Sequence, residues 1–381
     1  MQENTQKIDH GYDPLLIAAV FALTVIGFGI TSSALFGQAS TQTSLIVTNK
    51  MIHKQMFAFI VGLSFFLIVI SSRWSMLYKT EKRVNRIITI STIIGWLSLL
   101  GLFVFGHRSG GAIRWYRFGP VSFQPGEFFK VLFIIYIAYK LGRIKEYLAT
   151  SSIYIIKPMI FLIFIDFTLL VLPDRGSMIQ ISGLVMIMTV TAMIKKKHIL
   201  IAGSGIAVMF AIAVIRSSNL MARIMSYLSP ELFAKGSAYQ TIKSSTMVTM
   251  GGLFGAGLGK GTLGGLHWLP EQYNDYIVSV LIEDLGLAGL LAVISLYLII
   301  LWRSTQLALN LKSPAQRYAA FGLGMLIISQ ANINIGVALN MIPTKGAILP
   351  FISHGGSAMI SFMLAIGGIE WLHRYAPRVD E

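Results

Sequence analysis

The chain has 381 residues, of which 55% are hydrophobic and only 12% are charged, and it contains no cysteine. Soluble domains carry about 25% charged residues, so this composition excludes an ordinary soluble domain and indicates an all-α protein that spans a membrane. The lack of cysteine excludes disulfides, thiolate catalysis and cysteine-built metal sites. A net charge of +15 would suggest nucleic-acid binding in a soluble protein. In a membrane protein, basic residues at the cytoplasmic ends of the helices explain this charge better. Because no basic patch is interleaved with aromatic residues, we expect no nucleic-acid partner.

Apolar runs of about 18 residues or more can cross the roughly 30 Å of hydrocarbon in a bilayer. The residues before the first run lack the basic segment of a cleaved signal peptide, so we expect the first run to remain as a helix. We predict one membrane domain over residues 1–381, with about ten spans: 15–36, 54–72, 87–106, 126–142, 153–172, 177–194, 198–216, 276–302, 316–341 and 347–371.

Basic residues gather in every second connection, as in the Lys195–Lys197 run and the group between Arg73 and Arg86. Because such residues favour the cytoplasmic side, we expect both termini to be cytoplasmic. The opposite, outer side then receives a long connection, about 217–275. Its early segment "LMARIMSYL" (220–228) has helix-like apolar spacing, which predicts ordered structure at the membrane surface.

Asp275 lies where this long connection enters the eighth predicted span. Asn274 or Asp275 could cap the helix by accepting hydrogen bonds from free backbone N–H groups. The Asp275 carboxylate could also line an outward-facing cavity and accept a proton from a substrate hydroxyl. The two interpretations are compatible.

Basic residues also occur on the outer side, where topology disfavours them. Several outer connections carry a basic residue close to Gly or Pro. Arginine offers paired donors and lysine a point charge to phosphate groups, so these residues favour a converging site for an anion such as a lipid pyrophosphate. They are Arg114, Arg117, Arg175, Lys260 and Lys345.

Several charged residues fall inside predicted spans, where charge is costly and usually faces other helices; among them are Glu127, Lys130, Asp166, Glu283 and Asp284. Glu127 and Lys130 are three residues apart and could form an ion pair on one helix face. We expect Asp166 and Asp284 to make hydrogen bonds between helices. For Glu127, Lys130 and Glu283, a structural and a functional role remain equally open.

The segment "GLFGAGLGKG" superficially resembles a phosphate-binding glycine loop, but no strand precedes it and the spacing differs. We expect its glycines to allow tight turns and close helix contacts. The seven histidines show no paired metal spacing, and His354 is predicted to serve packing.

Five stretches, in order along the chain, resemble motifs of the SEDS family, which includes RodA, FtsW and SpoVE. Ordered matches over nearly the whole chain are far more specific than one motif. They are "RWYRFGPVSFQPGEFFK" (114–130), "LPDRGS" (172–177), "AYQTIKSSTMVTMGGLFGAGLGKG" (238–261), "LPEQYNDYIVSVLIEDLG" (269–286) and "IPTKGAILPFISHGGSAM" (342–359).

The resemblance implies a membrane glycosyltransferase that polymerises lipid II into peptidoglycan on the outer face of the bacterial inner membrane. It also implies a class B penicillin-binding protein as partner. The family's essential aspartate falls on Asp275. Other motif positions fall on Arg114, Trp115, Glu127, Lys130 and Asp174, which with Arg175 and Lys345 form the expected substrate site; Glu271 and Glu283 are expected to support it.

The chain departs from the family motifs near the proposed base. The family's His-Thr before the aspartate is Tyr273-Asn274 here, and its "SYGGSS" reads "SHGGSA" from Ser353. The "PTKG" sequence is more typical of FtsW than of RodA, which favours the division branch. We expect inverting transfer with Asp275 as general base, possible help from Mg²⁺ or Mn²⁺, and two open alternatives: a transporter of lipid-linked precursor, or a non-catalytic scaffold.

Overall fold

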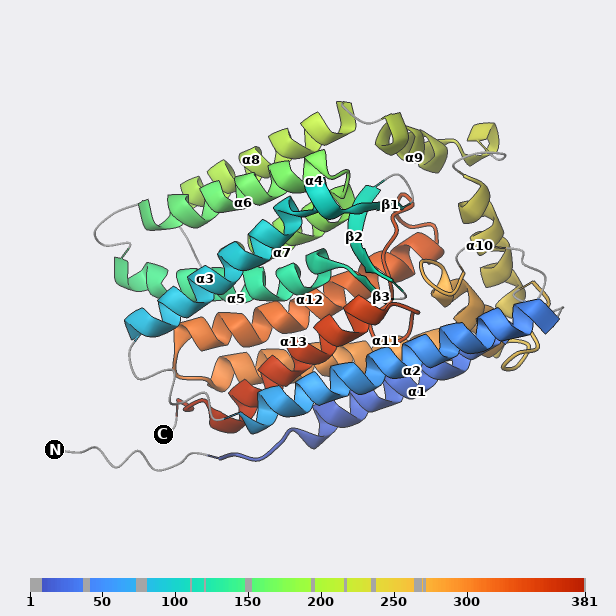
Figure 1. Ribbon diagram of the computed structural model, residues 1–381, viewed down its shortest axis with the longest axis horizontal. Coiled ribbons are helices and arrows are strands. Elements are labelled where there is room, and N and C mark those ends of the chain that lie inside the picture. The colour runs from blue at the N-terminus through green and yellow to red at the C-terminus, as the bar shows by residue number, and fades with distance from the viewer. Residues whose placement is uncertain are drawn as a thin grey trace.

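In the computed structural model, the chain forms a bundle of long helices that run side by side (Figure 1). Both termini lie at one end of this bundle. Three short strands and several short helices lie toward the other end. The structure describes residues 9–36, 42–72, 81–109, 112–119, 121–147, 153–192, 196–215, 218–233, 238–263, 269 and 272–379.

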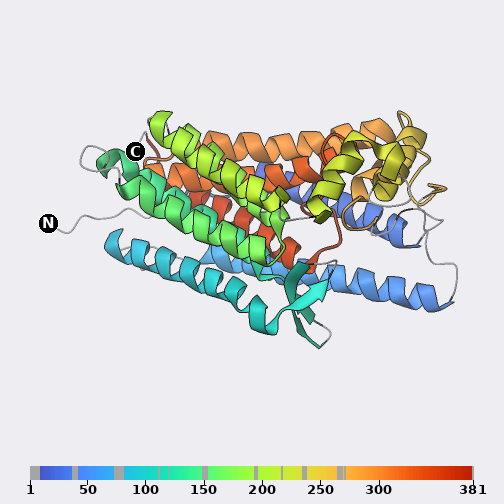
Figure 2. The same cartoon turned by 90° about the horizontal axis from the view of Figure 1, so that it is seen from above.

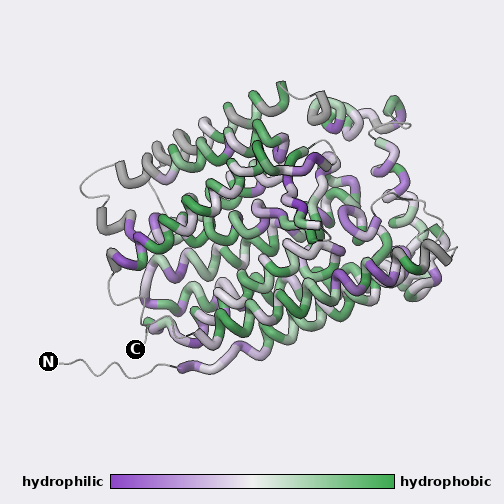
Figure 3. The backbone as a smooth tube through the Cα atoms, viewed as in Figure 1, coloured by the Kyte–Doolittle hydropathy of each residue, from purple (hydrophilic) through white to green (hydrophobic). Residues whose placement is uncertain are grey.

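Within these ranges, ten helices of 17 residues or more lie where the ten spans are predicted, which confirms the helical membrane fold. Their middle sections are hydrophobic and their ends are more polar, as the hydropathy colouring shows (Figure 3). Five segments in these ranges are long and apolar enough to cross a membrane: Pro14–Leu35, Thr48–Ser71, Arg83–Phe105, Ile277–Asn310 and Pro314–Ala338. The ten are α1 (Pro14–Phe36), α2 (Gln42–Ser71), α3 (Glu81–Leu100), α5 (Pro125–Tyr147), α6 (Ile153–Val171), α7 (Arg175–Thr191), α8 (Lys196–Ile215), α11 (Ile277–Asn310), α12 (Pro314–Ala338) and α13 (Gly356–Tyr375).

Some predicted boundaries are wrong. Helix α2 begins at Gln42, twelve residues before its predicted start, because its first turns are polar and carry no membrane signal. Helix α13 begins at Gly356 and not near 347. The residues before it form an irregular loop in which Phe351 has φ 65°, a conformation that a helix cannot contain.

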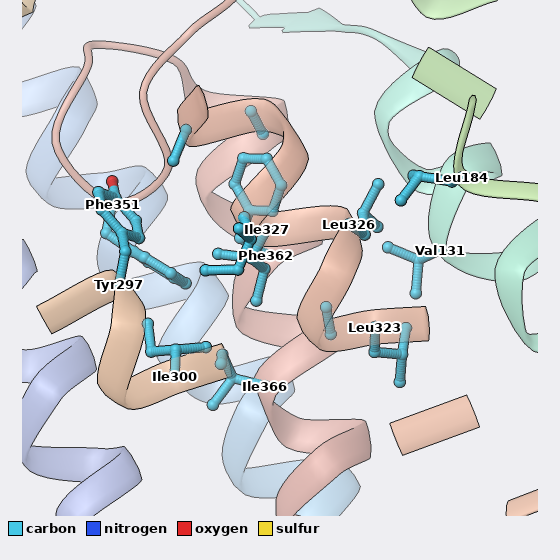
Figure 4. Close-up of a cluster of buried hydrophobic side chains, with 14 of the residues drawn as sticks. Val131, Leu184, Tyr297, Ile300, Leu323, Leu326, Ile327, Phe351, Phe362 and Ile366 are labelled. Carbon is cyan, nitrogen blue, oxygen red and sulfur yellow. The ribbon is translucent and has the colours of Figure 1, made fainter. Parts of the chain in front are cut away.

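The core lies around α12, which contacts α5, α11 and α13. Figure 4 shows Leu323, Leu326 and Ile327 of α12 between side chains of the neighbouring elements. The ring of Phe351 is buried there too, and the Tyr297 hydroxyl donates a hydrogen bond of 2.5 Å to the Pro350 carbonyl oxygen. The irregular loop before α13 is thereby held inside the bundle.

The connection between α3 and α5 forms an additional feature that the sequence did not predict. After the short helix α4 (Leu102–Phe105), three antiparallel strands follow: β1 (His107–Ser109), β2 (Ala112–Phe118) and β3 (Val121–Phe123). Seen from above, they continue the line of α3 along one side of the bundle (Figure 2). The Tyr116 hydroxyl donates to the Ser98 carbonyl oxygen at 2.7 Å, which fastens β2 to α3.

The long outer connection contains α9 (Ser218–Leu228), a short 3-10 helix (Pro230–Phe233) and α10 (Tyr239–Gly251). Helix α9 confirms the order predicted for residues 220–228. It lies at the end of the bundle that carries the strands (Figure 1).

A glycine-rich loop after α10 is joined to a break in α11. At Gly286, φ is 69°, so the helix is interrupted and its backbone groups become available. The N–H groups of Ala256 and Gly257 donate to the carbonyl oxygens of Glu283 and Asp284, each at 2.9 Å. The prediction that these glycines serve tight turns and close approach is confirmed.

Candidate active site

Four segments converge at the end of the bundle that carries the strands. They are strand β2, the start of α5, the turn between α6 and α7, and the loop between α12 and α13. Each brings at least one of the charged residues that the sequence singles out. These segments are far apart in the chain, so the site exists only in the folded protein.

Arg114 on β2 forms an ion pair with Asp174, with 3.1 Å between Nε and Oδ1. Asp174 is the N-cap residue of α7, and the Ser177 hydroxyl donates to its Oδ2 at 2.7 Å. Burial alone would raise the pKa of Asp174, but the charge of Arg114 and the bonds from Ser177 outweigh it and hold the pKa below its usual value. Asp174 is therefore an ionised anchor for Arg114.

Glu127 and Lys130 form the ion pair predicted from their spacing, with 3.0 Å between Oε2 and Nζ. Both side chains are buried. Lys130 also donates to the side-chain oxygens of Gln180 on α7 and Gln330 on α12, at 3.2 and 3.3 Å. Its ammonium group is thus held in one position at the centre of the bundle end.

Lys345 lies in the loop between α12 and α13, and its Nζ atom is buried. Its side chain packs against Gly176, where an added Cβ would lie 2.6 Å from Cε. Among the residues that the structure describes, none accepts a hydrogen bond from this Nζ. Burial, with the positive charges of Lys130 and Arg114, lowers the pKa of Lys345 to about 7, although Asp174 and Glu127 act in the opposite direction.

Asp275 lies beside the same loop. A methyl group added to Gly346, the neighbour of Lys345, would lie 3.1 Å from its Oδ2 atom. Asn334 on α12 fixes this arrangement, because its side-chain nitrogen donates to the carbonyl oxygens of Asp275 at 3.0 Å and Ala347 at 2.5 Å. The Asp275 residue is partly exposed.

Neither Asn274 nor Asp275 occupies the N-cap position of α11, so that prediction is wrong. The position belongs to Tyr276, which makes no side-chain capping bond. The helix starts one residue later than expected because residues 272–276 form a turn. The Asn274 carbonyl oxygen accepts from the Ser353 hydroxyl at 2.7 Å, which joins this turn to the loop before α13.

Two of the residues that depart from the family motifs, Tyr273 and His354, contact each other. The rings of Tyr273 and His354 meet edge to face, with centroids 6.1 Å apart, and the His354 backbone N–H donates to the Tyr273 carbonyl oxygen at 3.0 Å. The packing role predicted for His354 is confirmed. The pair supports the turn that carries Asp275.

Glu283, Trp115 and Lys260 have other surroundings. Glu283 accepts from the Leu263 backbone N–H at 2.7 Å and so serves the glycine-rich loop. Trp115 follows Arg114 in β2, and the alternation of strand side chains directs it to the opposite face. Glu271 lies outside the residues that the structure describes. Lys260 is exposed on the glycine-rich loop.

The remaining charged residues within spans behave as predicted. Asp166 on α6 accepts from the Ser182 hydroxyl of α7 at 2.7 Å. Asp284 accepts from the hydroxyl of Ser33 on α1 and from the Gly259 backbone N–H. Both carboxylates therefore hold neighbouring segments together.

Arg223 on α9 belongs to the site but was not predicted. It donates to the Thr344 carbonyl oxygen at 3.0 Å, immediately before Lys345. Its charge also interacts with those of Asp275, Arg114 and Arg175. The amphipathic pattern of α9 predicts its helix, but nothing in the pattern indicates that this arginine returns to the loop before α13.

A small pocket opens beside the ion pair of Arg114 and Asp174. Gln124 contributes to its polar side, and apolar residues of α3, α4, β2, α6 and the turn after α6 line most of the remainder. Within the described part of the chain, no three His, Asp or Glu side chains lie close enough to hold a metal ion.

The sequence matches the FtsW, RodA and SpoVE family, described as "Cell cycle protein", over residues 14–377. It is 32% identical to a probable peptidoglycan glycosyltransferase FtsW of Legionella pneumophila, over 92% of this chain and 87% of the relative. It is 31% identical to a protein of the same name from Geobacter metallireducens, over 96% of this chain and 95% of the relative.

Two solved structures share the fold. A chain of a peptidoglycan synthase complex, described as coordinating polymerization and crosslinking, superposes with a TM-score of 0.72 at 22% identity, over 96% of this chain and 98% of the other. The rod shape determining protein RodA of Thermus thermophilus superposes with a TM-score of 0.67 at 23% identity, over 96% and 97%. With the match over residues 14–377, the chain belongs to the FtsW, RodA and SpoVE family of multi-pass membrane proteins.

Proposed function

We propose that this protein is a peptidoglycan glycosyltransferase that polymerises lipid II on the outer face of the bacterial inner membrane. One observation carries the proposal: the carboxylate of Asp275, a partly exposed residue, lies beside the loop that brings Lys345 into the cluster of Arg114, Lys130 and Arg175. A base next to fixed cations suits transfer of a sugar from a pyrophosphate leaving group to a hydroxyl. The names of the relatives support the same reaction.

In this proposal, Asp275 accepts the proton of the 4-hydroxyl of the incoming sugar as that oxygen attacks the anomeric carbon. A positioned base contributes typically 10²–10⁴-fold. The bond to the pyrophosphate breaks on the opposite side, which inverts the configuration and requires no covalent sugar on the protein. Lys345, Arg114, Lys130 and Arg175 stabilise the negative charge of the departing pyrophosphate.

The residues of the site fit a divalent cation only in part. Mg²⁺ prefers carboxylate and phosphate oxygens and usually shares the latter with substrate. Asp275 could provide such an oxygen, whereas Glu127 and Asp174 are already paired with Lys130 and Arg114. A bound ion would therefore depend largely on the substrate, and the mechanism proposed here uses the cations of the chain.

The partner proposed is a class B penicillin-binding protein that crosslinks the new strands. The solved complex that shares this fold combines polymerization with crosslinking, which supports such a pairing. The FtsW names of the relatives favour cell division as the process served. The "PTKG" sequence ending at Gly346 points to the same branch.

The decisive experiment is polymerisation of purified lipid II by the purified chain, with and without the cognate partner. Asp275→Asn removes the base while keeping the size of the side chain, so we expect loss of glycan strands without loss of thermal stability. Continued chain growth in Asp275→Asn would contradict the assigned base. In liposomes, translocation of labelled lipid II without polymer would instead support a transporter, and normal growth of cells carrying Asp275→Asn would support a scaffold.

A further inference from the structure

A second polar pocket lies at the opposite end of the bundle, where both termini are found (Figure 1). It encloses about 200 Å³. Its polar lining combines side chains from the start of α1, the end of α11, the end of α13 and the C-terminal segment. They are Asp13, Arg303, Gln306, Asn310, His373 and Arg378.

The Asp13 carboxylate, which lines the pocket, already has hydrogen-bond partners and an ion pair with Arg303. Asp13 Oδ1 accepts from the backbone N–H groups of Leu15 and Leu16, so this carboxylate caps α1. Its Oδ2 accepts from Arg303 Nε at 2.6 Å. A buried second carboxylate, Glu370, accepts from the Asp13 backbone N–H at 3.1 Å and does not line the pocket.

The other lining groups present mainly hydrogen-bond donors. The Gln306 side-chain oxygen accepts from Arg303 Nη1 at 2.6 Å, which leaves the amide nitrogen to donate. His373 Nδ1 lies 3.3 Å from the Gly11 carbonyl oxygen, which requires a proton on Nδ1. Its Nε2 then accepts from Arg378 Nη2, 3.4 Å away. Because Arg303 is paired with Asp13, the lining keeps one net positive charge, that of Arg378, and the remaining hydrogens of Arg303 with the Gln306 amide are further donors; this composition suits an anion.

Arg378 is held in place by the backbone around it. Residues Leu311 and Arg378 form an antiparallel bridge. The Lys312 N–H donates to the Pro377 carbonyl oxygen and the Val379 N–H to that of Asn310, at 3.0 and 2.9 Å. The C-terminal segment is thus attached to the end of α11, and the guanidinium belongs to a built site.

Exposed apolar side chains lie close in the chain to the residues that line the pocket. Trp302 and Leu309 of α11 are 54% and 71% exposed, and Tyr12 and Leu15 at the start of α1 are 44% and 39% exposed. Tryptophan and tyrosine are enriched where a membrane surface meets water. An acyl chain could lie against this surface while its head group enters the pocket.

We infer that this pocket binds the phosphodiester head group of an anionic phospholipid through Arg303 and Arg378, at the membrane surface opposite the candidate active site. Basic pockets between membrane helices recognise such head groups by charge and hydrogen bonding. The site is independent of the polymerisation chemistry. It ties α1, α11, α13 and the C-terminal segment together when occupied.

The first test compares two lipids on the purified full-length protein. Phosphatidylglycerol and phosphatidylcholine with identical acyl chains are titrated in detergent, and bound lipid is counted by native mass spectrometry. We expect at least threefold higher occupancy for phosphatidylglycerol, and a higher thermal midpoint with phosphatidylglycerol alone. Equal occupancy and equal midpoints for the two lipids would overturn the proposal.

Two variants locate the effect. Arg378→Gln removes a donor, and Gln306→Glu keeps the acceptor for Arg303 while adding a negative charge to the pocket. Both are expected to reduce occupancy by phosphatidylglycerol to that of phosphatidylcholine. The control is Arg86→Gln, which removes an exposed arginine of α3 at the same end of the bundle. Equal loss in the control would show a general surface attraction and contradict the site.

Free phosphate is the alternative source of the same chemistry. In detergent without added lipid, millimolar inorganic phosphate should leave the thermal midpoint of the wild type unchanged. A rise with phosphate that Arg378→Gln abolishes, together with no preference for phosphatidylglycerol, would overturn the lipid as occupant. No response to either probe would overturn the anion site itself.

Discussion

The ring of Tyr273 meets the ring of His354 edge to face, and these are the two positions at which the family motifs carry His and Tyr in the reverse order. The same two ring types therefore meet with their places exchanged. The contact lies next to Asp275 in the chain and joins its turn to the loop before α13. If the contact matters, a change in one ring should be compensated by a change in the other.

This exchange predicts strong coupling between the two positions. Tyr273→His or His354→Tyr alone should reduce polymerisation of lipid II, by about two- to tenfold if an aromatic contact of about 0.5–1.5 kcal/mol is lost. The double variant should recover most of the activity. A double-mutant cycle measures this, and purely additive losses would show that the rings act independently.

Lys345 predicts a pH dependence of substrate binding. With a pKa of about 7, its ammonium form is complete well below pH 7 and is lost as the pH rises. A pyrophosphate favours the charged form, so the apparent KM for lipid II should increase above pH 7, by up to about tenfold per pH unit.

The matched variant is Lys345→Arg, because arginine keeps its charge over this range. Its KM should be nearly independent of pH between 6 and 9, whatever its value. Equal pH slopes for Lys345→Arg and the wild type would assign the titration to another group.

The buried pair of Glu127 and Lys130 predicts a separation of stability from activity. Removing one partner leaves a buried charge without compensation, so Glu127→Gln or Lys130→Met should cost about 3–5 kcal/mol of folding free energy. The double variant should be more stable than either single variant. Because Lys130 is also proposed to face pyrophosphate, the double variant should remain inactive, and thermal unfolding with a polymerisation assay would check both outcomes.

Gly286 predicts a local requirement for glycine in α11. An alanine there would have to adopt positive φ, at about 1–2 kcal/mol, and its Cβ would collide with the backbone of Leu253 and Phe254. We expect Gly286→Ala to lower the thermal midpoint clearly. Gly29→Ala is the control, since no atom lies within 4 Å of the added Cβ. An equal midpoint for the two variants would show that the break carries no constraint.

The parts of this protein that could be predicted are those set by local pattern. Apolar runs gave the long helices, and the spacing of Glu127 and Lys130 gave their ion pair, because both depend on residues within one helix. The strand β2 was missed because seven residues inside a short connection give a weak signal. Its Arg114 could be expected near the other charged residues of the site but not against Asp174.

Contacts between distant segments required the fold. Lys345 and Gly176 are far apart in sequence, and their close approach follows from the packing of α7 beside α12. The contact of Arg223 could not be predicted either, because its partner is the backbone oxygen of Thr344. Every residue has such an oxygen, so the sequence does not distinguish this one. The charges of the site were thus predictable as a set, whereas their arrangement around Asp275 was not.

The attachment of the glycine-rich loop to α11 bears on how freely this protein can diverge. Several of its bonds join main-chain atoms, which every amino acid except proline supplies in full, so most side chains along both segments, apart from Glu283 and Asp284, can change without loosening it. Change is blocked chiefly where a side chain would occupy the space of the opposing backbone, as at Gly251 against Ile282 and at Gly286. Relatives should therefore preserve the shape of this region long after its other residues have been replaced.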